Sequence, residues 1–376
     1  MNTLQRVAYV NLEKWLSKHK ALVLIGARQV GKTTLVNQLI ENSNEKALYL
    51  TGDEANVQNI LSTASLAQLK DLIGTNKLLV IDEVQRIDNA GLLLKRIVDN
   101  FKTVKLIATG SSALEISDKI FEPLTGRHIL LHLYPFSLFE LYKDENIITI
   151  NENLPFHLVH GFYPEICTNR IDAELLLKNL ASQYLYKDVL IWKDIRKPEL
   201  LDKLLQLLAY QMGSEVSLNE LATQLKVKTE TVDSYIDLLE KAFVVFRLKA
   251  YNTNQRKEVS KLKKIYFWDN GIRNAIINDF RPIQNRQDVG ALFENMMIAD
   301  RQKMNEWKSK SSKPYFWRTL QQQEVDYLEK TSSQLNAFEF KYSLTQKVRF
   351  TKAFSNVYPE ATTQIISPND IKDFCW

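Results

Sequence analysis

Eight consecutive residues near the start of the chain have the types and spacing of a phosphate-binding loop. They fit the pattern G-x-x-x-x-G-K-[ST] and are Gly26, Ala27, Arg28, Gln29, Val30, Gly31, Lys32 and Thr33. In such a loop the glycines let successive backbone N–H groups point at phosphate oxygens. The Lys32 ammonium would contact the β and γ phosphates, and the Thr33 hydroxyl would bind Mg²⁺. Together with Thr34, these residues predict a nucleotide-binding site.

The segments around this loop have the order that the loop requires. The apolar run 21–25 predicts a buried strand, and 34–40 predicts a helix whose N-terminus adds partial positive charge beside the phosphates. A second apolar run, 77–81, ends in Asp82 and Glu83, as a buried parallel strand does when its carboxyl end faces a ligand. Asp82 can hold Mg²⁺ through water, and Glu83 can orient the water that attacks the γ-phosphate.

A third strand, expected over 103–112, also ends in polar side chains. We expect Ser111 to contact the γ-phosphate, with Thr109 as the alternative. A solvated strand end explains Asp82 and Glu83 equally well when they are taken alone. Because the carboxyl ends of parallel strands meet at one edge of a sheet, the three strands together predict an α/β domain with a hydrolytic site at that edge.

The last hundred or so residues contain a second group that could perform chemistry, namely Asp326, Glu339 and Lys341, with Glu294 upstream. A hairpin can bring Asp326 beside Glu339, so that both carboxylates hold a divalent cation while Lys341 positions water or offsets negative charge. Glu294 could complete the cluster. The expected order is αβββαβ, with elements at 289–304, 314–318, 324–328, 335–342, 345–357 and 363–366.

The middle of the chain is expected to be helical over 138–199, as a lid, and to form a winged helix-turn-helix over 200–252. In the second helix of this motif, polar side chains could face DNA while apolar ones pack inward; the two sets are Thr229, Glu230, Thr231 and Ser234, and Val232, Tyr235, Ile236 and Leu239. Acids on the same face, Glu230, Asp233 and Asp237, would repel phosphate. The alternative is a motif that packs only against neighbouring domains.

A basic stretch follows this motif. Between Arg247 and Lys264 there are seven Lys or Arg residues and one acid, Glu258. Such a local excess of positive charge suits a DNA phosphate backbone and predicts salt-dependent binding. A solvated linker or wing is the alternative.

The ordered motifs resemble those of the AAA+ superfamily of P-loop ATPases, and more closely a group of uncharacterised bacterial and archaeal ATPases. The matching elements are Gly26 to Thr33, Leu78 to Gln85, Thr109 to Ser112, Leu124 to Arg127 and Leu133 to Ser137. The resemblance implies ATP with Mg²⁺ as cofactor and a homo-oligomer, with a hexamer as the leading expectation. It also implies that Arg127 reaches a neighbouring subunit's site as an arginine finger, although a structural salt bridge fits equally well.

The pattern of Asp326 followed by Glu339-Phe340-Lys341 resembles the PD-(D/E)xK nuclease superfamily. This resemblance implies a restriction-endonuclease-like domain that binds Mg²⁺ or Mn²⁺ through Asp326 and Glu339. Such a domain can also keep its fold without the chemistry. The expected domains are therefore an AAA+ core over 1–137, a lid over 138–199, a winged helix over 200–252 and a nuclease-like domain over 253–376.

The composition is that of an ordinary soluble protein, with 376 residues, 45% hydrophobic residues and a net charge of +5. The two cysteines, Cys167 and Cys375, have no metal or redox spacing, and we expect neither a signal peptide nor a membrane span. We therefore expect a cytoplasmic ATPase that acts on DNA, with cleavage left open. The alternatives are an NTP-driven regulatory switch and a protein-remodelling ATPase, each with an inert C-terminal domain.

Overall fold

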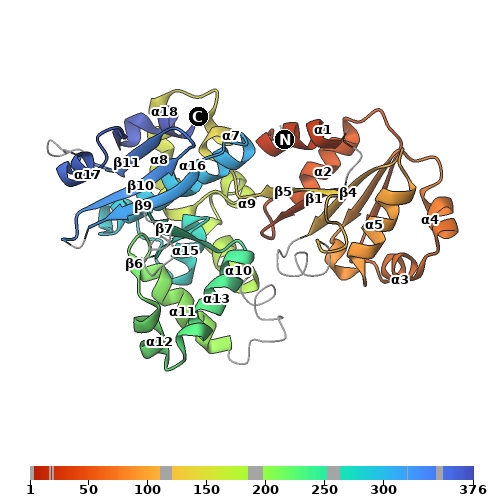
Figure 1. Cartoon of the computed structure of the whole chain (residues 1–376), viewed down its shortest axis with the longest axis horizontal. Coiled ribbons are helices and arrows are strands. Elements are labelled where there is room, and N and C mark those ends of the chain that lie inside the picture. The colour runs from red at the N-terminus through yellow and green to blue at the C-terminus, as the bar shows by residue number, and fades with distance from the viewer. Residues whose placement is uncertain are drawn as a thin grey trace. The chain divides into compact units, whose positions relative to one another are not determined.

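A parallel sheet of five strands lies at the centre of the N-terminal part of the computed structural model, which describes residues 4–16, 18, 21–110, 121–184, 198–251, 263–319, 321–343 and 350–376. Contacts divide the chain into two units, 1–134 with 241–243, and 135–240 with 244–376 (Figure 1). In the first unit the strand order is β2 (Ala47–Thr51), β3 (Leu78–Asp82), β4 (Lys105–Gly110), β1 (Ala21–Gly26) and β5 (His128–Leu133).

The strands of this sheet are apolar because both of its faces are covered. All residues of β1 and β3 are buried, as expected for central strands of a parallel sheet. The connecting helices are α1 (Val7–Leu16), α2 (Lys32–Glu41), α3 (Ala55–Thr63), α4 (Leu66–Ile73), the 3₁₀ turn η1 (Val84–Arg86) and α5 (Ala90–Asn100). The predicted α/β core is confirmed, with β1, β3 and β4 adjacent and their carboxyl ends at one edge.

The second unit begins with helices and continues into a mixed sheet. Its first elements are α7 (Leu138–Tyr142), α8 (Ile147–His160), α9 (Pro164–Thr168), α10 (Ala173–Tyr184), α11 (Pro198–Tyr210), β6 (Glu215–Val216), α12 (Leu218–Leu225), α13 (Thr229–Lys241), β7 (Val245–Ala250), β8 (Lys263–Phe267) and α15 (Asn270–Ile276). Residues 185–197 of the helical lid expected over 138–199 lie outside the described residues.

The C-terminal elements have the expected αβββαβ order. They are the 3₁₀ turn η3 (Ile283–Asn285), α16 (Val289–Trp307), β9 (Lys313–Arg318), β10 (Glu324–Lys330), β11 (Leu335–Phe340), α17 (Lys352–Val357), β12 (Thr362–Ile366), the 3₁₀ turn η4 (Pro368–Asp370) and α18 (Ile371–Cys375). Residues 345–349 of the expected helix 345–357 lie in the part that is not described. The relation of this order to the nuclease superfamily stays a prediction.

One sheet joins segments that the sequence assigns to different domains. In the described part of the second unit its strand order is β12-β11-β10-β9-β7-β8-β6. Strand β7 pairs in parallel with β9, so that Ala250 lies opposite Phe316. Strand β7 lies in the segment 200–252, expected as a separate winged helix, and β8 lies in the segment 253–376. Both strands belong to one sheet with the C-terminal strands. The division of residues 138–376 into three domains stays a prediction.

Buried amides connect the middle helices of this unit to its C-terminal part. The Asn270 and Asn274 side-chain amides donate to backbone carbonyls at the end of α8, with Asn274 Nδ2 at 2.8 Å from the oxygen of Val159. The Asp269 carboxylate accepts from the backbone N–H of Phe162 at 2.7 Å. Because a helix end that is buried without partners is costly, α15 holds α8 in place through these bonds.

Candidate functional site

The phosphate-binding loop connects β1 to α2 in the geometry that its sequence predicts. A Cβ atom at Gly26 would lie 2.0 Å from the carbonyl oxygen of Leu133, so only glycine fits where β1 passes β5. Gly31 has φ 92°, in the left-handed region that glycine adopts without strain, and α2 begins at the next residue. The tight turn at Gly31 therefore places the N-terminus of α2 at the loop.

A buried arginine that sequence reasoning missed supports the loop. The Arg6 guanidinium donates to the carbonyl oxygens of Val30 at 2.8 Å and Tyr134 at 2.6 Å. The sequence motif does not mark Arg6, because this residue lies outside the motif, ahead of α1. Its two bonds fix the backbone of the loop to the segment after β5, which preorganises the loop for phosphate.

Lys32 lies with its ammonium inside the loop. Its Nζ donates to the carbonyl oxygens of Gly26 at 3.0 Å and Ala27 at 2.7 Å, and the side chain is buried. Thr33 and Thr34 are exposed at the start of α2, Gln29 is exposed, and Arg28 is half-buried. The exposed hydroxyls and the lysine ammonium provide the donors and the charge that a phosphate chain requires.

The Asp82 carboxylate accepts hydrogen bonds from hydroxyl groups on neighbouring elements. Its Oδ2 accepts from Thr33 Oγ1 at 2.9 Å and from the Tyr49 hydroxyl at 2.6 Å, and its Oδ1 accepts from Thr109 Oγ1. Burial and the Asp82 bond raise the pKa of Tyr49 above its usual range, so this phenol stays a donor. Thr33 and Asp82 offer the hard oxygen ligands that Mg²⁺ prefers, and the structure brings them together as predicted.

Glu83 follows Asp82 in a strained conformation. Its φ is 50°, in the left-handed region, and its backbone N–H donates to Thr109 Oγ1 at 3.2 Å. This turn places the two consecutive acids in different surroundings, since Asp82 is buried and Glu83 is half-buried. The Glu83 carboxylate accepts a hydrogen bond from the Gln85 side chain. Thr109, fully buried, fixes both acids, whereas Ser111 lies outside the described residues. The roles of Glu83 and Ser111 stay predictions.

Arg127, the expected arginine finger, has an ion pair within its own unit. Its Nε lies 2.8 Å from Asp99 Oδ1, and its Nη1 donates to the Thr125 carbonyl at 3.3 Å. The hydrogen bond from Arg127 lowers the pKa of Asp99. The guanidinium is 40% exposed, so it can exchange this partner for another at low cost. A role for Arg127 in a neighbouring subunit stays a prediction.

The residues expected to form the nuclease-like site come from β10, β11 and α16. The Asp326 carboxylate accepts from the backbone N–H of Phe340 at 2.9 Å, and Lys341 Nζ lies 3.8 Å from Glu339 Oε2. Glu294 accepts a hydrogen bond from the Tyr266 hydroxyl of β8, and its side chain is largely buried. Burial, followed by repulsion from Asp326, raises the pKa of Glu294 to about 7. Burial also raises the pKa of Asp326 and of Glu339.

The structure adds residues to this cluster that sequence reasoning missed, above all Lys264. Its ammonium, 1% exposed, lies 3.5 Å from Glu294 Oε1 and forms an ion pair with Glu324. The Tyr266 hydroxyl donates to Glu294 Oε1 at 2.6 Å. Burial acts to lower the pKa of Lys264, but attraction by Glu294, Glu324 and Asp326 outweighs it and raises the pKa, so the lysine stays charged.

This arrangement does not fit the metal site expected at Asp326 and Glu339. In the part of the chain that the structure describes, no group of three or more His, Cys, Asp or Glu side chains could hold a metal ion. Asp326 accepts a backbone N–H, Glu339 pairs with Lys341, and a buried lysine lies among the remaining acids. Neither Mg²⁺ nor Mn²⁺ at this cluster is supported, because its acids already have fixed partners, among them the Lys264 ammonium.

Three basic residues of this stretch, Arg247, Lys263 and Lys264, form ion pairs within the second unit. Arg247 contacts acids of α13, with its Nη2 at 2.9 Å from Asp233 and its Nη1 at 2.6 Å from Glu240. Lys263 lies 3.6 Å from Asp233, and Lys264 belongs to the buried cluster. Lys249 is exposed, and Arg256, Lys257, Glu258 and Lys261 lie outside the described residues, so the contact of this stretch with DNA stays a prediction.

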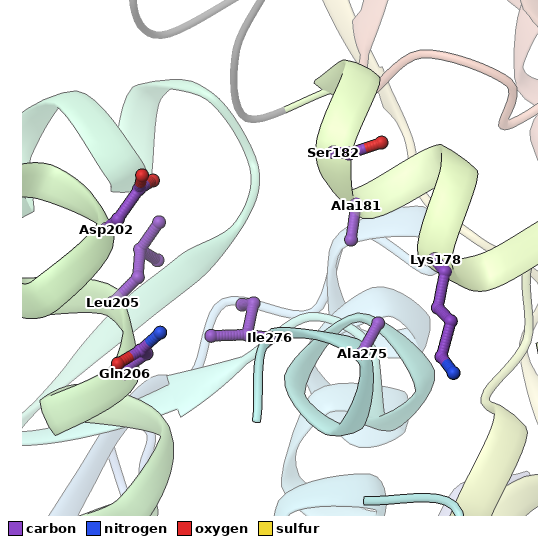
Figure 2. A pocket seen from close by; sticks show the side chains of 8 residues that line it. All are labelled: Lys178, Ala181, Ser182, Asp202, Leu205, Gln206, Ala275 and Ile276. Atoms are coloured by element: carbon purple, nitrogen blue, oxygen red, sulfur yellow. The ribbon is translucent and has the colours of Figure 1, made fainter. Parts of the chain in front are cut away.

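A cavity of about 240 Å³ lies elsewhere in the second unit, between α10, α11 and α15. Figure 2 shows its lining, formed by Lys178, Ala181, Ser182, Asp202, Leu205, Gln206, Ala275 and Ile276. Lys178 is paired with Glu174 at 2.7 Å. None of the predicted site residues lines this cavity.

Among the described helices, none has the length and apolar character needed to cross a membrane.

Comparison with known families gives three matches along the chain. Residues 18–142 match an AAA domain, 151–282 match a domain of unknown function (DUF8612), and 289–371 match another domain of unknown function (DUF4143). The first region, which contains the loop and Asp82, is similar to AAA domains. The two later matches name no activity.

Similar proteins extend over most of the chain. An uncharacterized protein of Methanocaldococcus jannaschii is 27% identical over 321 residues, covering 74% of this chain and 67% of that protein. One of Mycobacterium tuberculosis is 26% identical over 352 residues, covering 92% and 75%. A STAND signal-transduction ATPase of Pyrococcus horikoshii matches with 13% identity and a TM-score of 0.31, covering 82% of this chain and 48% of that chain. A Pif1 helicase of Bacteroides matches with 16% identity and a TM-score of 0.26, covering 49% and 52%. Such TM-scores are too low to indicate a shared overall fold.

Proposed function

We propose that the first unit binds and hydrolyses ATP with Mg²⁺. The observation that carries this proposal is the 2.9 Å contact between Thr33 Oγ1 and Asp82 Oδ2 beside the Lys32 loop. When bound, Mg²⁺ would be held by Thr33 and Asp82 and would offset charge on the phosphates. Lys32 would contact the β and γ phosphates, and Glu83 would orient the attacking water.

Two substitutions test these roles. Lys32→Ala is expected to abolish tight ATP binding, whereas Glu83→Gln is expected to keep binding and lose hydrolysis, because only water activation is removed. Binding is measured with a fluorescent ATP analogue, and turnover by phosphate release. Lys46→Ala and Glu54→Gln are matched controls at exposed positions of the same unit. Normal turnover in Glu83→Gln would remove this glutamate from the mechanism.

We further propose that the ATPase acts on DNA through its second unit. The order α11, β6, α12, α13, β7 and β8, with β8 antiparallel to both β6 and β7, supports a winged helix. The apolar face of α13 packs inward as expected, since Val232 and Ile236 are buried. Its outer face carries the exposed Ser234. The ion pairs of Arg247 with Asp233 and Asp237 also reduce the repulsion that these acids would exert on phosphate.

This DNA hypothesis is tested by ATP turnover of the full chain in the presence of duplex, single-stranded and branched DNA. Stimulation by one of these is the expected result, and it should weaken steeply with salt if phosphate contacts carry the binding. Unchanged turnover with every DNA would contradict action on DNA while leaving the ATPase proposal intact. A homo-oligomer, with a hexamer as the leading expectation, is tested on the same samples by light scattering with and without ATP.

A specific observation favours a second candidate, an NTP-driven regulatory switch or protein-remodelling ATPase whose C-terminal domain performs no chemistry. This observation is the buried Lys264 among the acids of the expected nuclease site. For the same reason, metal-dependent cleavage is not part of the proposed function. ATP turnover that responds to no DNA, combined with intact DNA after long incubation with Mg²⁺, would support the switch.

A further inference from the structure

The acidic cluster of the second unit is built around one lysine. Lys264 leaves β8, passes the Phe316 ring of β9 with its Nζ 5.5 Å from the ring centroid, and forms an ion pair with Glu324 on β10. Its Nζ also lies 3.5 Å from Glu294 Oε1 on α16. A lysine stem that passes an aromatic ring to reach carboxylates on another strand and a helix is held by packing as well as by charge.

The acids of this cluster also have other fixed partners. Arg318 Nη1 lies 3.3 Å from Glu324 Oε2 and 3.3 Å from Glu215 Oε2. The Tyr266 hydroxyl and the Phe340 N–H donate to Glu294 and Asp326. Buried carboxylates need such partners, because an unpaired buried charge is strongly unfavourable. A divalent cation shared by Glu294 and Asp326 would meet the Lys264 ammonium, which lies 3.5 Å from Glu294 Oε1, and the two positive charges would repel each other.

From this geometry we infer that the Lys264 ammonium takes the place of a divalent cation in the C-terminal acidic cluster, which therefore binds no catalytic metal. The cluster then stabilises the junction of β8, β10 and α16 and performs no hydrolysis. This inference concerns the second unit alone and does not depend on the proposed ATPase activity. It predicts that removal of the lysine charge converts the cluster into a site that accepts Mn²⁺.

The test measures Mn²⁺ binding to the full chain without nucleotide, by the loss of the free Mn²⁺ EPR signal. Asp326→Asn in each background isolates the contribution of this cluster. In the wild-type protein, Asp326→Asn is expected to leave the amount of bound Mn²⁺ unchanged. Lys264→Met is expected to gain about one bound Mn²⁺ per chain, and Lys264→Met with Asp326→Asn is expected to lose that gain. Lys263→Met, which removes the adjacent lysine that pairs with Asp233, should gain nothing.

Two outcomes would overturn the inference. The first is Mn²⁺ binding by the wild-type protein that Asp326→Asn abolishes, a measurement that does not depend on whether Lys264→Met folds. The second is a folded Lys264→Met protein, shown by an unchanged circular dichroism spectrum, that gains no Mn²⁺. ATP turnover of the same samples separates this inference from the proposed function, because failure of either leaves the other measurable.

Discussion

Asp82 in the first unit and Asp326 in the second both lie at strands beside basic residues, but their surroundings differ in charge. Asp82 is held by hydroxyl groups, from Thr33, Tyr49 and Thr109. Asp326 also accepts from a neutral donor, the Phe340 N–H, but its cluster contains fixed cations, Lys264 and Arg318, which pair with Glu324. Neutral donors orient a carboxylate and leave its charge for Mg²⁺, whereas a buried ammonium uses that charge internally. Acids near a lysine therefore indicate a metal site only where no buried cation already lies among them.

The largest effect that would sharpen this comparison is the loss of stability in Lys264→Met. Removal of the ammonium leaves the largely buried Glu294 without its cation, which is expected to cost about 3–5 kcal/mol of unfolding free energy, whereas Glu324 keeps Arg318. The measurement is urea denaturation followed by fluorescence, compared with Lys263→Met. Lys263 is 27% exposed in its ion pair, so its substitution should cost less than about 1 kcal/mol. Equal costs for both lysines would show that Lys264 is not a buried counter-ion.

A second effect concerns pH and distinguishes the acids of the two regions. Burial, followed by repulsion from Asp326, raises the pKa of Glu294 from 4.5 to about 7. Between these pH values the folded state binds more protons at this group than the unfolded state, so its contribution to stability falls as the pH rises. Glu294→Gln removes this slope and should therefore be more favourable, relative to wild type, at pH 8 than at pH 5.

The measurement for Glu294→Gln is denaturation of both proteins at pH 5 and pH 8. Glu360→Gln, at an exposed position of the same unit, is the matched control and should show the same difference from wild type at both pH values. A difference for Glu294→Gln that is independent of pH would show that this carboxyl titrates as an ordinary solvated group.

The first site could be predicted from sequence because most of its functional residues are adjacent in the chain. Gly26 to Thr33 fixes loop, lysine and hydroxyl within eight residues, and the run ending in Asp82 needs only an adjacent parallel strand. Tyr49 was missed because its role depends on the pairing of β2 with β3, where Thr51 lies opposite Asp82. No motif marks a single tyrosine on an edge strand.

The second site could not be predicted because its charges come from distant strands. Lys264 was counted among phosphate-binding residues, since the sequence does not show that β8 joins the same sheet as β10. The ion pairs of Arg247, in contrast, have a signal in the sequence. Its partners Asp233 and Asp237 lie on the preceding helix, and their spacing of four residues was already a signal for one shared cation.

The smallest effect tests whether neutral donors prepare Asp82 for Mg²⁺. Tyr49→Phe removes the hydroxyl that lies 2.6 Å from Asp82 Oδ2 but leaves the bonds from Thr33 and Thr109. Loss of one such bond, about 1 kcal/mol, should raise the Mg²⁺ concentration for half-maximal ATP turnover about fivefold. Turnover at saturating Mg²⁺ should change little, because the acting groups are retained.

Tyr9→Phe is the matched control for Tyr49→Phe, since the Tyr9 hydroxyl contacts Asn42 at 3.2 Å in the same unit. A Mg²⁺ titration of turnover compares the three proteins. If Tyr49→Phe lowers maximal turnover without changing the Mg²⁺ requirement, this hydroxyl acts on the reaction and not on the orientation of Asp82. If it changes neither, Thr33 and Thr109 alone hold the carboxylate. The contrast with Lys264 would then rest on fewer neutral donors, while the difference in charge between the two sites would remain.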